Sequence, residues 1–425
     1  MNLNGWDTVS VIDQGKVNRK LSDNASKLVM NFNTGWEDGF SGDYLGQGDF
    51  GAWKIVGGSG TDIHIEIPII VGHAWPKGKE EKKTDLAGIT LTYEVNLALI
   101  PSSVHGEGKK LQFEIHKVTP AGQQRSEGGI SLIGQTDPHH TKFARQLGQA
   151  LAGVLVDNND KISFIFAQVG ISGDGVPAWL EPVQSRYSYH VPQGGTKGYL
   201  AVLSMTTQGD LPSSGTNIDS GLIPSDHDVT FAMSGDLFLE HIIMPALPDA
   251  FSNASLDNFS YSSGKISLAK DFDLDGVQVA AITYYPKMTS MDITIDSGKI
   301  KNVAKGSVYL DMPNAYLNYG STVENKLEYD ASTQKISFDK DPNPSTHHSA
   351  DVPWYDYLLG LGAIGAAIIA AVLAGVESGV GSSLSGSNMG GSLRSATAKV
   401  VSWGNDVTVK AGTLEDCFYM QGNIS

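Results

Sequence analysis

The sequence predicts an α+β fold in which antiparallel sheets wrap around long apolar helices, divided into two lobes. Three observations lead to this prediction. Several segments alternate apolar and polar side chains strictly, as half-buried strands do. The order helix, strands, helix, strands occurs twice along the chain. One segment near the C-terminus, Leu358–Val376, is apolar throughout, which is typical of a helix that other elements enclose.

The first half of the chain is expected to contain two helices. Apolar residues recur at roughly helical spacing from Met1 to about Phe32, and Asp7 is the expected N-cap. A second apolar stripe runs along Asp137–Val156. The remaining apolar segments predict strands at Ile63–Ile69, Ile89–Leu97, Leu111–Ile115, Ile162–Val169, Tyr187–Val191 and Tyr199–Thr206.

A stretch rich in Gly, Ser and Pro, Gln208–Asp226, is the expected boundary, so the lobes are predicted to cover residues 1–210 and 211–425. In the second lobe, helices are expected near Asp236–Leu247 and Trp354–Val376. Strands are predicted at Val277–Tyr285, Met291–Ile295, Val308–Met312 and Ile336–Phe338. Three short turns of similar composition predict antiparallel hairpins at Ser263–Ile266, Ser297–Ile300 and Thr333–Ile336.

The apolar run Leu358–Val376 has the length of a membrane span, which needs about 20 residues. Asp351, Asp356 and Glu377 flank it, and this lack of positive charge speaks against a membrane anchor. We therefore expect a helix that is enclosed by the sheet and whose small-residue face packs closely against the strands. The alternative is a membrane span. The bulky face is the candidate hydrophobic site and comprises Leu361, Ile364, Ile368, Ile369, Val372 and Leu373.

Charge and cysteine content restrict the function. The net charge of −16 argues against nucleic acid as a partner, because phosphate binding needs clustered lysines and arginines. Cys417 is the only cysteine, so no disulfide forms within the chain and no cysteine-based metal site is expected. The segment Met1–Asp13 lacks the basic start and apolar stretch of a signal peptide. We expect synthesis in the cytoplasm without export by the general secretory route, with release by lysis or by a dedicated route left open.

No catalytic or cofactor motif is found, so neither an enzymatic activity nor a cofactor is expected. The adjacent pairs His139-His140 and His347-His348 are expected at the surface, because neighbours in a chain point in different directions. Asp271–Gly276 has acids at alternate positions, as a calcium loop does, but Ile282 stands where the bidentate acid belongs. A strand end or turn is the expected structure there. A β-rich hydrolase would rest only on composition and these loose carboxylates.

Several short segments, in the same order along nearly the whole chain, resemble the accessory proteins of clostridial neurotoxin gene clusters, of the P-forty-seven and OrfX type. The segments are Gly5–Val9, Trp179–Pro182, Gly198–Ser204, Leu237–His241 with Pro245 and Leu247, Tyr284–Lys287 and Trp354–Leu359. This family is similar to the tubular lipid-binding (TULIP) superfamily, in which antiparallel strands wrap a long apolar helix.

The resemblance implies two functions. The first is binding of a lipid or another hydrophobic ligand, with a lipid or membrane surface as partner. The second is assembly with other proteins of the toxin cluster without bound lipid. The family offers no ligand-contacting residues that can be transferred to this chain one by one, so the lipid function follows from fold analogy.

Overall fold

The computed structural model describes residues 1–37, 42–104, 106, 108–120, 122–171, 177–251, 253–279, 281–311, 314–333, 335–351, 366–368, 370–371, 374, 400–404 and 406–424. The chain divides into two compact units. The N-terminal unit comprises Val9–Val229, Ala398–Asp406 and Ile424–Ser425. The C-terminal unit comprises Met1–Thr8, Thr230–Thr397 and Val407–Asn423. These units are defined by compactness and are not contiguous in the sequence. The division into two lobes of residues 1–210 and 211–425 therefore stays a prediction.

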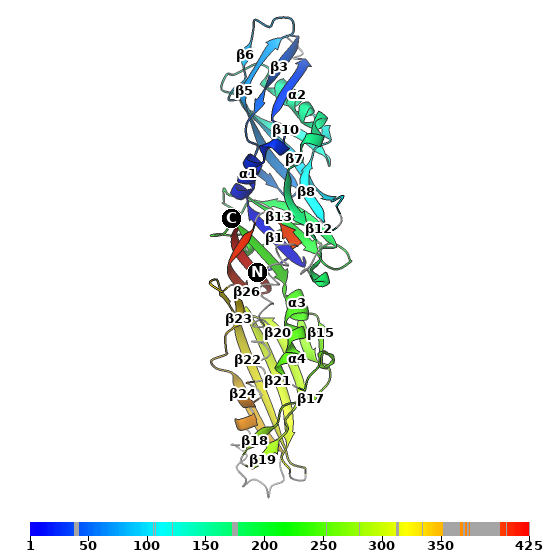
Figure 1. The fold of residues 1–425 in the computed structure, drawn as a ribbon, viewed down its shortest axis with the longest axis vertical. Helices are drawn as coiled ribbons and strands as arrows, with labels where there is room; N and C mark the ends of the chain where they lie inside the picture. Colours follow the sequence, from blue (N-terminus) through cyan, green and yellow to red (C-terminus); the bar gives the residue numbers. More distant parts are fainter. Residues whose placement is uncertain are drawn as a thin grey trace. The chain divides into compact units, whose positions relative to one another are not determined.

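The N-terminal unit is built on an eleven-stranded sheet (Figure 1). Its main path runs β2 (Asn31–Glu37), β3 (Asp43–Phe50), β5 (Asp62–Pro76), β7 (Thr90–Pro101), β8 (Lys109–Glu114), β11 (Ile165–Val169), β25 (Val401–Ser402). Beside it, β4 (Lys54–Ser59) and β6 (Thr84–Asp85) pair with β5, while β10 (Gly129–Thr136) pairs with β7 and β9 (Lys117–Val118). The predicted alternation is confirmed in β5, where Ile63, Ile65, Ile67 and Ile69 are all buried.

The predicted helix from Met1 to Phe32 is wrong in its first part. Thr8–Asp13 forms strand β1, hydrogen-bonded beside β13 (Tyr199–Met205), which in turn pairs with β12 (Gln184–His190). All six residues of β1 are buried, so the strand shows no alternation and its apolar residues resembled a helical stripe. Helix α1 covers only Gln14–Asp23, followed by a 3-10 turn at Ala25–Lys27.

The N-cap of α1 is Asp13 rather than Asp7. The Asp13 carboxylate accepts a hydrogen bond from the Lys16 backbone nitrogen at 3.2 Å. Its other oxygen lies 2.6 Å from Lys197 Nζ. Next to this cap, Trp403 brings a late part of the sequence to β1, since its Nε1 lies 3.0 Å from Ser10 Oγ and its ring is buried.

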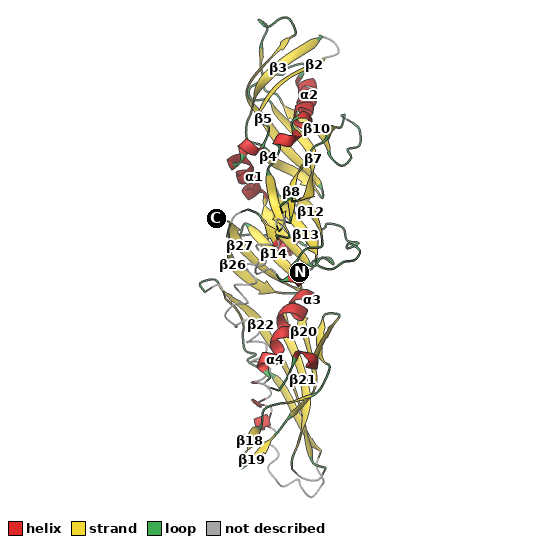
Figure 2. Ribbon diagram, turned by 45° about the vertical axis from the view of Figure 1, so that its right-hand side comes forward, coloured by secondary structure: helices red, strands yellow, loops and turns green. Residues whose placement is uncertain are grey.

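Helix α2 (Ala144–Asp157) confirms the second predicted helix, although it begins later than Asp137. It lies against β2 and β10 (Figure 2). Its buried stripe includes Leu147, Leu151 and Leu155. At Gly148 the helix approaches the sheet closely: the backbone oxygen accepts a 2.7 Å hydrogen bond from the buried Tyr93 hydroxyl, and an added Cβ would lie 2.7 Å from a Leu132 methyl carbon. Among the described residues of this unit, further 3-10 turns lie at Asn159–Lys161, Ala178–Leu180 and Ser220–Leu222.

The C-terminal unit contains an eight-stranded antiparallel sheet. Its main path is β15 (Phe259–Ser262), β16 (Lys265–Leu268), β20 (Lys287–Asp296), β21 (Lys299–Tyr309), β22 (Tyr316–Asp330), β23 (Lys335–Phe338). Beside it, β17 (Phe272–Asp273) pairs with β20 and β24 (Ser345–Asp351) pairs with β22. Three more strands of this part of the chain follow the order β14 (Val229–Ser234), β27 (Cys417–Ile424), β26 (Val407–Leu414).

The predicted helix near Asp236–Leu247 is confirmed as a helical segment that changes its winding. It consists of α3 (Gly235–Phe238), a π-helical stretch (Leu239–Ile243), a 3-10 turn (Met244–Ala246) and α4 (Leu247–Ala250). Ser234 caps it, because its hydroxyl accepts a hydrogen bond from Leu237 N at 3.2 Å. Pro245 and Pro248 lack a backbone N–H, which is consistent with the irregular winding. A further 3-10 turn follows at Leu256–Asn258.

The predicted hairpins are confirmed, and one predicted strand is corrected. Ser263-Gly264 and Ser297-Gly298 all have positive φ, as the two-residue turns between β15 and β16 and between β20 and β21 require. The third hairpin joins β22 and β23. The predicted single strand Val277–Tyr285 is instead a small hairpin of β18 (Val277–Val279) and β19 (Ile282–Tyr284).

The described residues thus form a β-rich fold of antiparallel sheets with few helices, and α2, at 14 residues, is the longest helix among them. The wrapping of sheets around long apolar helices stays a prediction, because most of Leu358–Val376 lies outside the described residues.

Candidate functional site

The predicted hydrophobic site is described at only one of its six positions. Ile368 is helical and fully buried. Leu361, Ile364, Ile369, Val372 and Leu373 lie outside the described residues.

The alanines around Ile368 differ from the expected arrangement. Ala366, Ala370, Ala371 and Ala374 are exposed, and Ala367 is half-buried. At the described positions the small residues therefore do not pack closely against strands, in contrast to the prediction. The physical reason is that burying an isoleucine removes far more apolar surface from water than burying an alanine. Within the part of the chain that the structure describes, no helix is long and apolar enough to cross a bilayer.

The carboxylates of Asp271–Gly276 lie at a strand end, as expected. Phe272–Asp273 forms β17, and the Asp271 carboxylate lies 3.6 Å from Lys287 Nζ. His139 and His140 are exposed, as are His347 and His348. Among the described residues, no group of three or more His, Cys, Asp or Glu side chains could hold a metal ion.

A cavity of about 310 Å³ in the N-terminal unit combines two cations with an aromatic wall. It lies where the end of α1 meets β11 and β25. The residues that define it are Lys20, Asn24, Lys27, Phe164, Phe166 and Gln168, together with Ser402 and Gly404. We call it the Lys20–Lys27 cavity. Its lining, as far as the structure describes it, holds two lysines and no carboxylate.

Backbone hydrogen bonds hold the two lysines at this place. Asn24 ends α1, and both its backbone nitrogen and its Nδ2 donate to the Lys20 carbonyl oxygen, at 3.1 and 2.9 Å. Lys27 closes the following 3-10 turn, and its carbonyl oxygen accepts from Ser163 N at 3.0 Å. This last bond ties the turn to the residues that precede β11.

Two phenylalanines also line the cavity. Phe164 and Phe166 are both buried, with ring centroids 4.9 Å apart and nearly perpendicular planes. Phe166 also packs edge-on against Phe113, at 4.8 Å. Gln168 pairs with Ser402 in the β11–β25 ladder, so both contribute polar groups at the rim.

The electrostatics of the cavity favour an anion. Burial, and to a smaller extent the nearby positive charge of Lys27, lower the pKa of Lys20 to about 8. An anion beside Lys20 would offset both effects, because it stabilises the charged ammonium. The cavity is at the lower end of the sizes seen for small-molecule sites, so it suits a headgroup rather than a whole lipid.

Sequence reasoning missed this cavity. Lys20 and Lys27 lie on the polar side of a segment that was expected to be one continuous helix. The break at Asn24 and the approach of β11 and β25, from distant parts of the sequence, bring the lysines beside the phenylalanines. Only the Asn at position 24, a residue that favours helix ends, marked the break in the sequence.

Comparison with known proteins defines the family. A family model described as OrfX-like, Protein OrfX2/OrfX3/P47, matches residues 3–402. The chain belongs to the OrfX-like family. The resemblance predicted from its sequence segments is thereby confirmed.

This OrfX-like protein is similar to P47 of Clostridium botulinum (strain Kyoto / Type A2), with 25% identity over 367 residues that cover 82% of this chain and 83% of that protein. It is 24% identical to OrfX3 of Paraclostridium bifermentans over 337 residues, covering 70% and 66%. The solved structure of P47 from C. botulinum A2 matches with a TM-score of 0.82 at 23% identity, covering 100% of this chain and 98% of that one. P47 of C. botulinum E1 gives 0.81 at 23% identity, covering 99% of each. These likenesses show that the fold is shared.

Proposed function

We propose that this OrfX-like protein is a non-enzymatic, TULIP-type binding protein of a toxin gene cluster, and that the Lys20–Lys27 cavity takes the anionic group of an amphiphile such as a phospholipid. It would act as an accessory component after release from the bacterium. Neither P47 nor OrfX3 has a name that denotes an enzyme, which is consistent with a binding role.

The observation that carries the proposal is the pairing of two lysines with an aromatic wall in one cavity. The ammonium groups of Lys20 and Lys27 would bind a phosphate or carboxylate by charge-assisted hydrogen bonds. Phe164 and Phe166 would contact the apolar atoms next to that group. A purely polar anion would contact the lysines alone. An amphiphile would contact both the lysines and the phenylalanines.

Sedimentation with vesicles tests the proposal. Wild-type protein is mixed with vesicles of phosphatidylcholine alone and with vesicles that also contain phosphatidic acid. In a separate experiment it is titrated with inorganic phosphate and with hexyl phosphate. We expect Lys20→Gln and Lys27→Gln each to weaken binding to phosphatidic acid vesicles about tenfold or more, since a hydrogen bond to a charged group contributes about 1.5–3 kcal/mol. The matched control is Lys82→Gln, which removes an exposed lysine from a loop of the same unit.

The probes separate the sources of the anion. Stronger binding of hexyl phosphate than of inorganic phosphate supports an amphiphile, and equal binding reduces the site to an anion site. If vesicles and both phosphates fail to bind, and mass spectrometry of organic extracts finds no lipid, the proposal is overturned. Assembly with other proteins of the toxin cluster would then be the better hypothesis.

A further inference from the structure

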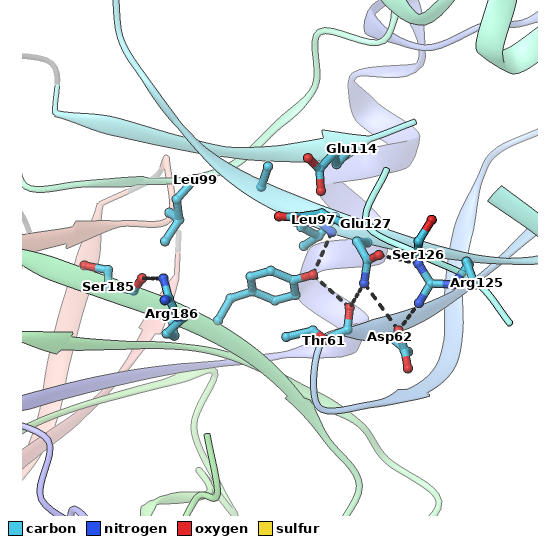
Figure 3. A pocket seen from close by; sticks show the side chains of 13 residues that line it. Thr61, Asp62, Leu97, Leu99, Glu114, Arg125, Ser126, Glu127, Ser185 and Arg186 are labelled. Carbon is cyan, nitrogen blue, oxygen red and sulfur yellow. Dashed lines mark hydrogen bonds and ion pairs between the residues drawn. The ribbon is translucent and has the colours of Figure 1, made fainter. Parts of the chain in front are cut away.

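A second cavity in the N-terminal unit, of about 630 Å³, is polar rather than aromatic. It lies between β7, the loop that precedes β10, and β12 (Figure 3). Leu97 and Leu99 contribute its apolar surface. In Figure 3, Ser185 and Arg186 lie on one side of the cavity, while Arg125 and Asp62 lie on the other.

One side of this cavity is fixed by Arg125, whose side chain is only 8% exposed. Its Nε lies 2.9 Å from Glu94 Oε1, and its Nη2 forms an ion pair with Asp62. Its Nη1 donates to Asn96 Oδ1. Two carboxylates therefore balance this guanidinium, which orders the wall and leaves no net positive charge for a ligand.

Tyr187 adds a second rigid element. Its hydroxyl accepts a hydrogen bond from Leu97 N at 2.8 Å and donates one to the Thr61 carbonyl oxygen at 2.8 Å. Because both bonds are to backbone, the ring is held between β7 and the residue before β5. The ring is buried and forms part of the cavity lining.

On the Arg125 side of the cavity, the carboxylates of Glu114 and Glu127 are available to a ligand. Glu114 is largely buried, with 17% of its side chain exposed, and Glu127 is exposed on the loop. Burial raises the pKa of Glu114, and the negative charge of Glu127 raises it further, so a cation beside them would stabilise both carboxylates. Among the described residues, Glu114 has one ion pair, a long one of 4.0 Å to the exposed ring of His116.

Arg186 provides the opposite charge on the other side. Arg186 is exposed, and its Nη1 donates a long hydrogen bond of 3.4 Å to the Ser185 carbonyl oxygen. Among the described residues, Arg186 forms no ion pair with a carboxylate. With Arg125 balanced by Asp62 and Glu94, the cavity presents negative charge from Glu114 and Glu127 and positive charge from Arg186.

We infer that this cavity binds a small zwitterion, with its ammonium group beside Glu114 and Glu127 and its phosphate or carboxylate beside Arg186. Phosphocholine and phosphoethanolamine have this chemistry, either free or as lipid headgroups. A ligand of one charge would satisfy only one side and leave the other side hydrated. This inference is independent of the Lys20–Lys27 cavity, because the two cavities share no lining residue.

Calorimetric titration tests the inference with four probes: phosphocholine, phosphoethanolamine, choline and glycerol phosphate. We expect the two zwitterions to bind more tightly than either single-charge probe. Arg186→Gln should weaken binding of both zwitterions about tenfold, the loss expected for one charge-assisted hydrogen bond. Glu114→Gln should weaken phosphoethanolamine binding by a similar factor, and should weaken phosphocholine binding through the lost ion pair alone, because a quaternary ammonium has no N–H to donate. Glu81→Gln and Arg19→Gln are the matched controls, since both remove an exposed charge from the same unit outside the cavity.

A Lys20→Gln variant should bind phosphocholine as wild type does, and this separates the two cavities. Phosphatidylcholine vesicles then distinguish the source: binding that is lost in Glu114→Gln indicates a lipid headgroup, and binding of free phosphocholine alone indicates a soluble zwitterion. The inference is overturned if no probe binds at millimolar concentration. It is also overturned if choline binds as well as phosphocholine and Arg186→Gln has no effect, because the cavity would then be a simple cation site.

Discussion

The side chain of Lys20 lies so close to Gly404 that a Cβ on this glycine would be 2.9 Å from Lys20 Nζ. The lysine therefore owes its place to the absence of a side chain at position 404. Gly404 also has a φ of +86°, in the left-handed region that residues with a Cβ adopt only at a cost. This pair of residues gives the first prediction.

Gly404→Ala should displace the Lys20 ammonium and weaken binding of hexyl phosphate, and it should lower the free energy of unfolding by about 1–2 kcal/mol through backbone strain. The control is Gly194→Ala, because Gly194 also has a positive φ of 75° but an added Cβ there would meet nothing within 4 Å. Denaturant unfolding should give similar losses for the two variants. Only Gly404→Ala should lose affinity, and equal affinity in both would contradict the assigned position of Lys20.

Replacing Lys20 by methionine should raise stability while it weakens anion binding. The pKa of Lys20 in the folded protein, about 8, lies below the 10.5 of an unperturbed lysine. The unfolded chain therefore binds more protons between these values, and the cost of the buried ammonium is fully present below about pH 8. Thermal unfolding at neutral pH should show a higher midpoint for Lys20→Met, and a lower midpoint would mean that the ammonium stabilises the fold.

The same pKa predicts how anion binding depends on pH. As pH rises through about 8, Lys20 loses its charge in the free protein, so affinity for hexyl phosphate should fall. Hexyl phosphate keeps its charge over this range, since its second pKa is about 6. The titration is repeated in the Lys20→Gln variant, where this part of the pH dependence should be absent. An identical pH profile in both proteins would assign the titration to another group.

Asp13 should be important for the start of α1 in two separable ways. Asp13→Asn keeps a capping oxygen and loses the charge that pairs with Lys197, so a loss of about 0.5–1 kcal/mol is expected. Asp13→Ala loses the cap as well and should cost about 1–2 kcal/mol more. Chemical denaturation of both variants measures the difference. Asp7→Ala should cost less than Asp13→Ala, because Asp7 precedes β1 and does not cap the helix.

The apolar segment near the C-terminus can be tested at its described positions. Ile368→Ala should destabilise the protein by about 2–5 kcal/mol, since Ile368 is fully buried. Ala371→Leu should be tolerated, because Ala371 is exposed and a larger side chain has room. A loss of more than about 1 kcal/mol for Ala371→Leu in denaturation would instead indicate that a close-packed partner covers this face.

The sequence was most informative where one face of an element is buried and the other is in water. The four isoleucines of β5 and the leucines of α2 show their periods plainly, so strand and helix could be predicted at once. The positive-φ turns at Ser263-Gly264 and Ser297-Gly298 were also readable, because few residues adopt that backbone. In contrast, Thr8–Asp13 is buried on both faces, and nothing in its pattern distinguishes a central strand from a helix.

Neither cavity could be predicted, because their residues come from distant parts of the chain. Lys20 shares a cavity with Phe166 and Gly404, and Glu114 shares one with Arg186, only after the sheet has formed. A lysine or glutamate at the surface of an element looks the same in the sequence whether it faces water or a cavity. The family resemblance supplied the fold, but it named no residues for a site.

The path of the chain also has a consequence for its synthesis. The N-terminal unit includes β25 and Trp403, which are translated long after Val229, and the C-terminal unit includes Met1–Thr8, which precede the N-terminal unit in the sequence. A nascent chain on the ribosome therefore cannot complete its first unit while the second is still being made. Residues after Thr397 belong to both units, so a chain truncated before Ala398 should leave neither of them whole.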